Sequence, residues 1–184
     1  MSRYVTFDAG LRSVPTDPEA LAEVVGEVRA ALRAAEQAGD DRTVLALTRE
    51  LGAGLLALGD HAAAARHFAR AVGLAEAAGN VRSAIAARIN LGDAHRYAGD
   101  YASAEPLYRR ALDDARRAAP DLVDFPLQHL GKHCTEAGRR AEALALLREA
   151  LALREAKGDP SLLASTRAAL RLLNGSDAAE DLAV

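Results

Sequence analysis

Two histidines four residues apart, His129 and His133, have a spacing that could hold a metal ion. Positions i and i+4 lie on one face of a helix, where two imidazoles can share a zinc ion. Cys134 and Glu136 are near in sequence, but no glutamate directly follows His129 and no third ligand can be identified. Cys134 falls on a core-facing position, so burial explains it better than metal binding. We therefore predict no metal site and no cofactor.

The chain also lacks the short motifs that carry common enzyme chemistry. It has no phosphate-binding glycine loop, no nucleophile elbow, no dinucleotide-binding glycine motif and no paired-carboxylate motif. We therefore predict that the protein is not an enzyme, and we assign no catalytic residues. The net charge of −3 creates no overall positive potential that would attract nucleic acid.

Composition and hydropathy indicate a soluble protein. A single cysteine excludes an internal disulfide. The first thirty residues contain no long apolar run, so no signal peptide is predicted. No stretch approaches the roughly 20 apolar residues that a membrane span needs. We expect a cytoplasmic protein without membrane partners, and the abundance of alanine and arginine suggests a bacterial source.

Glycine recurs at a nearly fixed step and divides the chain into helices. An acidic or amide residue follows most of these glycines, in the pairs Gly39-Asp40, Gly59-Asp60, Gly79-Asn80, Gly99-Asp100 and Gly158-Asp159. Glycine can end a helix in the left-handed conformation, and the Asp or Asn after it can cap the next helix. We therefore predict an all-α chain without strands. The expected helices are 17–38, 41–57, 60–78, 81–97, 100–118, 121–137, 140–157 and 160–173.

Small and apolar residues recur about every 40 residues, so the repeating unit is a pair of helices. The recurring sets are Leu51-Gly52, Leu91-Gly92 and Leu130-Gly131 in the first helix of each pair, and Phe68, Tyr108 and Leu147 in the second. Facing small residues let two antiparallel helices approach closely, and the larger side chain fills the wider gap beside them. No pair can bury its apolar surface alone, so the pairs are expected to stack.

These residues resemble the tetratricopeptide repeat in its longer form, as in kinesin light chains and bacterial regulators. The segment 99–112 matches best, with a Gly-Asp-Tyr turn followed by Ala, an aromatic residue and Ala-Leu. The resemblance implies a right-handed superhelical α-solenoid of about eight helices in one domain, residues 16–174. Its parts would be a half repeat at 17–38, repeats at 41–78, 81–118 and 121–157, a capping helix at 160–173, an N-terminal arm at 1–15 and an acidic tail at 175–184.

Repeat three departs from the family pattern. Arg139 and Arg140 replace the Asp-Tyr pair at its turn, and Pro120 and Pro126 disturb the start of its first helix. This helix could therefore begin only at Asp124, with Pro126 in its first turn.

The resemblance also implies a protein-protein interaction module that binds a peptide or partner helix on the concave face formed by the first helices. The residues expected on that face are Arg49, Glu50, Asn90, Asp93, Arg96, Tyr97, His129 and Lys132. Asn90 matches an asparagine that binds peptide backbone in such families, a task that suits its paired donor and acceptor. The carboxylate clamp of chaperone-tail binders is incomplete, because Ala53 and Phe125 stand where asparagine and lysine are expected.

Two other functions stay open. The chain could be a self-associating homodimeric scaffold, or a peptide or small-molecule sensor that regulates a separate effector. The N-terminal arm bears on the first of these, because Tyr4 and Phe7 are aromatic residues outside the repeats. The arm could be disordered, pack on helix 17–38, or lie in a groove of its own chain or of a neighbour.

Overall fold

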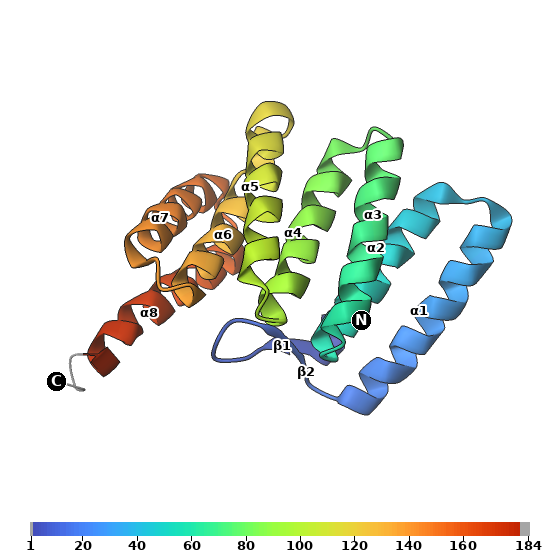
Figure 1. The fold of residues 1–184 in the computed structure, drawn as a ribbon, viewed down its shortest axis with the longest axis horizontal. Helices are drawn as coiled ribbons and strands as arrows, with labels where there is room; N and C mark the ends of the chain where they lie inside the picture. The colour runs from blue at the N-terminus through green and yellow to red at the C-terminus, as the bar shows by residue number, and fades with distance from the viewer. Residues whose placement is uncertain (1, 181–184) are drawn as a thin grey trace. The chain divides into compact units, whose positions relative to one another are not determined.

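A repeat of antiparallel helices forms the protein, as predicted. The computed structural model describes residues 2–180, with side chains described from 3 to 175, and this part contains eight α-helices (Figure 1). The chain divides into two compact units, residues 1–107 and 108–184, with the boundary inside helix α5 (Tyr101–Ala118). No helix in the described part is long and apolar enough to cross a membrane.

Unit 1 holds four complete helices, each packed against the next along the chain. They are α1 (Pro18–Ala38), α2 (Asp41–Ala57), α3 (His61–Ala77) and α4 (Val81–Tyr97). The capping interpretation is confirmed here, because Asp40, Asp60 and Asn80 each accept a hydrogen bond at 3.0 Å from the backbone N–H three residues on. Gly39 ends α1 with a left-handed φ of 67°. The predicted limits are matched at α2 and α4 and differ by one residue per end at α3.

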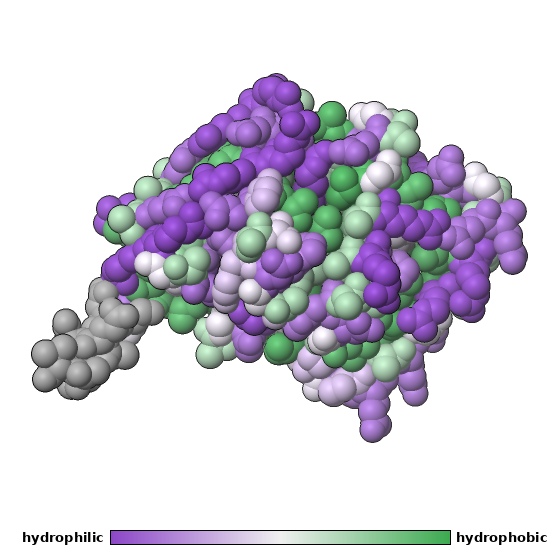
Figure 2. Space-filling view, viewed as in Figure 1, coloured by the Kyte–Doolittle hydropathy of each residue, from purple (hydrophilic) through white to green (hydrophobic). Residues whose placement is uncertain are grey.

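The close approach of α2 and α3 depends on Gly52. A Cβ atom at this position would lie only 2.7 Å from Cε1 of Phe68, whose side chain is fully buried. A second, smaller core cluster between α2, α3 and α4 consists of Leu45 and alanines. In the view of Figure 2, apolar residues reach the surface among hydrophilic ones over α3 and α4.

The N-terminal arm forms a β-hairpin, so the expectation of a chain without strands is wrong. Strands β1 (Val5–Phe7) and β2 (Ser13–Pro15) are antiparallel, with Val5 opposite Pro15 and Phe7 opposite Ser13. The hairpin packs on unit 1, where β2 contacts α2, and Val5 lies against the main core. Such short strands carry too few residues for an alternating pattern to be recognised.

Within unit 2, the chain after α5 is irregular, as the prolines of repeat three indicate. A 3₁₀ turn (Pro120–Leu122) precedes α6 (Asp124–Glu136), which packs on α7 (Arg140–Lys157), and α7 packs on α8 (Pro160–Glu180). The first helix of repeat three therefore starts at Asp124 and not at 121. Helix α8 continues beyond the predicted end at 173 and takes in the first part of the predicted acidic tail. Residues 181–184 of that tail lie outside the described residues.

Candidate interaction surface

Three of the predicted binding residues form what we call the α2–α4 strip: Arg49 and Glu50 on α2, and Asn90 on α4. Helices α2 and α4 are in contact, and Asn90 occupies the position of Glu50 one repeat later. Glu50 is exposed, whereas Arg49 and Asn90 are half-buried. None of the three side chains has a hydrogen-bond or ion-pair partner within the described part of the chain.

Arg49 carries the most unusual atom of this strip. Its Nε is buried and finds no acceptor among residues 3–175. Burial also lowers the pKa of the Arg49 guanidinium from its ordinary value, because the charged form loses hydration. The pKa of an arginine is so high that the group stays charged at neutral pH. The Arg49 guanidinium in the strip is thus a poorly hydrated cation, and its buried Nε donates no hydrogen bond within the described residues.

Two other predicted residues, Asp93 and Arg96, pair with each other inside the protein. Arg96 is fully buried, and its Nη2 donates a hydrogen bond to Oδ1 of Asp93 at 3.2 Å. Its guanidinium carbon also lies 4.9 Å from the centre of the Tyr97 ring. A buried charge pair of this kind supports the helix more readily than it contacts a ligand.

Tyr97, also predicted on the binding face, fastens the hairpin to α4. The Ser13 N–H donates a hydrogen bond to Tyr97 Oη at 2.8 Å. The Arg12 guanidinium carbon lies 5.3 Å from the centre of the Tyr97 ring, and the His61 ring meets that ring edge-on at 6.0 Å. Burial raises the pKa of the Tyr97 hydroxyl. Arg12 was not among the residues predicted from the sequence. The aromatic residues of the N-terminal arm were the one sign in the sequence that the arm could pack against the repeats.

In unit 2, the predicted residues His129 and Lys132 lie on α6. The half-buried ring of His129 lies 6.3 Å from the Tyr108 ring, centre to centre, and His133 lies 5.8 Å from the same ring. The two histidines therefore share an aromatic neighbour. Lys132 is buried. Among the described residues, no group of three or more His, Cys, Asp or Glu side chains is placed to hold a metal ion.

A buried polar network joins α6 to α7 and α8. Arg154 donates to Asp124 Oδ2 through Nε and to Thr166 Oγ1 through Nη1, both at 2.8 Å. Gln128 joins the network by donating to Ser165 Oγ at 2.8 Å. All of these residues except Ser165 are fully or almost fully buried. This network could not be predicted from the sequence, because its partners lie 12 to 37 residues apart.

The family model for the tetratricopeptide repeat matches residues 42–117 and again residues 82–156. The chain belongs to the tetratricopeptide repeat family. Its fold is therefore that of a protein-interaction module, in a family whose members typically act as scaffolds without catalysis. A search of curated proteins found no match to this tetratricopeptide repeat chain.

Solved structures show the same repeat fold. The chain is similar to BtubC (BKLC) from P. vanneervenii, with 18% identity and a TM-score of 0.63 over 88% of this chain and 76% of that one. It is also similar to the Rap protein in complex with competence and sporulation factor, with 18% identity and a TM-score of 0.65. That match covers 86% of this chain but only half of the Rap chain. Likeness at this level of identity establishes the fold of the tetratricopeptide repeat protein and nothing finer.

Proposed function

We propose that this tetratricopeptide repeat protein binds a peptide or a partner helix through the α2–α4 strip. The observation that carries the proposal is the buried Nε of Arg49, which has no acceptor in the described part of the chain. An unpaired buried donor costs on the order of 1–3 kcal/mol. If the Arg49 side chain turns toward the surface, its Nε can donate to a carbonyl or carboxylate oxygen of a partner. That bond would remove the cost and favour the complex.

The other two residues of the strip complement Arg49. The Asn90 amide offers a donor and an acceptor, so it can pair with both polar groups of a peptide backbone. Glu50, exposed beside Arg49, would favour a basic group on the partner. Under this proposal the protein acts in the cytoplasm without catalysis. The Rap protein, a structure of the same fold, was solved with a bound factor, which supports partner binding by such an array.

Affinity capture with the full chain tests the proposal. Proteins retained by the wild type would be compared with those retained by the double variant Arg49→Ala/Asn90→Ala. The matched control is Arg66→Ala/Asn174→Ala, which removes the same two residue types from exposed positions elsewhere. We expect the strip variant to retain about tenfold less of its specific partner, or less still. The control should retain as much as the wild type. Equal retention by both variants would place the binding site elsewhere.

Arg96 is unsuitable for such an experiment, although the sequence placed it on the same face. Its guanidinium is fully buried against Asp93. Removing it takes a buried ion-pair partner away from the Asp93 carboxylate, which typically costs several kcal/mol of stability. Lost binding in an Arg96 variant would therefore report damage to α4.

Self-association is the second function that a specific observation favours. Phe7 on strand β1 is 63% exposed, and it is one of three large hydrophobic residues exposed in the described part of the chain. An exposed aromatic residue is a common anchor in protein interfaces. Light scattering should give the mass of a dimer for the wild type and of a monomer for Phe7→Ser if the scaffold function holds. A monomeric wild type at micromolar concentration would exclude it.

A further inference from the structure

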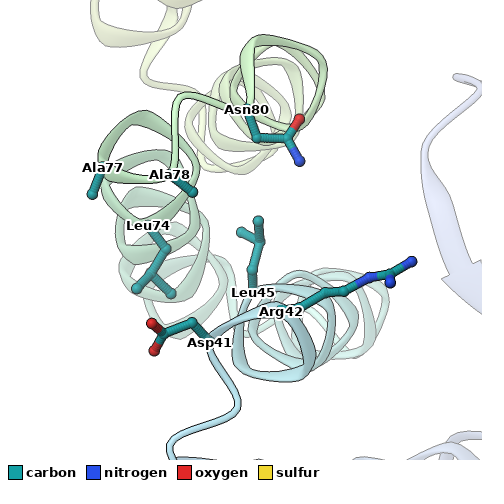
Figure 3. A pocket seen from close by; sticks show the side chains of 7 residues that line it. All are labelled: Asp41, Arg42, Leu45, Leu74, Ala77, Ala78 and Asn80. Carbon is teal, nitrogen blue, oxygen red and sulfur yellow. The ribbon is translucent and has the colours of Figure 1, made fainter.

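A pocket of about 430 Å³ opens at the end of unit 1 where α2 and α4 begin and α3 ends (Figure 3). Tyr97, which holds the hairpin, lies at the opposite end of α4. The pocket is lined by Asp41, Arg42, Leu45, Leu74, Ala77, Ala78 and Asn80. It is distinct from the α2–α4 strip and does not depend on the function proposed for that strip.

The pocket exists because the core beneath it is made of small side chains. Leu45 belongs to the second core cluster of unit 1, whose other buried members are all alanines. In Figure 3, the side chains of Leu45 and Leu74 extend from α2 and α3 into the space between these helices. Alanines cannot fill the gap where the helix ends separate, so an apolar hollow stays open. Its volume falls in the range of binding pockets for small ligands and side chains.

The rim of the pocket carries a negative charge. Asp41 is exposed, and its carboxylate has no hydrogen-bond or ion-pair partner among residues 3–175. The Arg42 side chain points away from the two leucines in Figure 3. Oδ1 of Asn80 is already engaged by the Ser83 N–H at 3.0 Å. Asp41 is therefore the charged group best placed to select what enters.

We infer that this pocket is a docking site for a peptide that inserts one side chain of leucine or phenylalanine size. A lysine or arginine next to that side chain pairs with Asp41. Burial of the apolar side chain in the hollow favours binding. The Asp41 carboxylate favours peptides with a basic residue over peptides with an acidic one. Val81, which directly follows Asn80 and is 41% exposed, extends the apolar character of this end of unit 1.

Nuclear magnetic resonance with short peptides tests this inference on the full chain. The probe is acetyl-Ala-Leu-Lys-amide, added to ¹⁵N-labelled protein in the millimolar range expected for so small a contact. The comparison peptides are acetyl-Ala-Leu-Glu-amide and acetyl-Ala-Ala-Lys-amide. We expect shifts of the amide signals of Leu45, Leu74 and Asn80, with each comparison peptide binding about threefold more weakly or worse. No shift at these amides, or equal binding of the three peptides, would overturn the inference.

Two variants separate the hollow from the charge. Ala78→Leu fills the pocket and should weaken the Leu-Lys peptide about tenfold. Ala98→Leu is its matched control, because Ala78 and Ala98 are exposed residues that cap α3 and α4 in the same way. Asp41→Asn, at an exposed position, should remove the preference for lysine over glutamate while keeping the dependence on leucine. Unchanged binding by Ala78→Leu, or an unchanged lysine preference in Asp41→Asn, would contradict the assignment.

Discussion

Replacing Gly52 by alanine should destabilise unit 1, whereas the same replacement at Gly73 should stabilise it. Both glycines are helical, and alanine favours a helix over glycine by about 1 kcal/mol at an interior position. The two sites differ in surroundings. A Cβ atom at Gly73 would meet nothing within 4 Å, but at Gly52 it would lie 2.7, 2.9 and 3.1 Å from three ring atoms of Phe68.

The magnitude follows from the packing around Phe68. Carbon atoms in contact normally lie about 3.5–4.0 Å apart, so the new methyl group at Gly52 requires the ring or the helix to move. Phe68 is fully buried, so a movement of its ring disturbs the side chains packed around it. Overpacking of this kind costs about 1–3 kcal/mol. The gain in helix propensity is common to both variants, so their free energies of unfolding should differ by this packing cost.

Urea unfolding followed by circular dichroism would measure the free energy of unfolding of the wild type and both variants. Adding Phe68→Leu to Gly52→Ala should recover part of the loss, because a smaller side chain makes room for the methyl group. The resulting coupling energy is expected to be about 0.5–3 kcal/mol. Equal stabilisation by Gly52→Ala and Gly73→Ala would show that α2 and α3 do not approach as closely as the structure indicates.

Three further perturbations test other parts of the molecule. Thr48→Val should leave stability unchanged or raise it by about 1 kcal/mol in urea unfolding, because the fully buried Thr48 hydroxyl has no hydrogen-bond partner among the described residues. Burial lowers the pKa of His61 below its ordinary 6.5. The neutral His61 therefore contributes fully to the free energy of unfolding above pH 6.5, and this contribution is lost as the pH falls through the folded-state pKa. Unfolding at pH 7.5 and 5.5 should show a smaller loss for His61→Gln than for the wild type. Arg154→Ala should cost about 3 kcal/mol in the unfolding of unit 2, because it removes the buried ion pair with Asp124 and leaves that carboxylate to the partly exposed Lys157.

The limits of most helices could be predicted because the signals that fix them are local. Asp40 caps α2 through the backbone of Thr43, only three residues away, and this relation can be seen in the sequence. The same holds for Asp60 and Asn80. The late start of α6 at Asp124 follows in the same way from Pro120 and Pro126.

The hairpin could not be predicted, because its signals are weak or distant. The turn places Leu11 in the left-handed region with φ 58°, so no glycine marks that position. The contact that fixes strand β2 joins Ser13 to Tyr97, 84 residues later in the chain. The roles of individual polar residues were hidden for the same reason. A fully buried arginine such as Arg96 looks, in sequence, like any charged residue on a helix surface.

The two units use equivalent positions of their first helices in different ways, and this bears on where specificity can arise. Gln128, the counterpart in repeat three of Arg49, is almost fully buried and hydrogen-bonded to Ser165, so its amide is committed to the fold. His129, the counterpart of Glu50 and Asn90, packs beside an aromatic ring. In unit 1, Arg49 keeps a buried donor without an acceptor. Polar groups that are already satisfied gain little from a ligand, whereas an unsatisfied one gains the whole hydrogen bond. Discrimination between partners should therefore depend on unit 1 more than on the corresponding positions of unit 2.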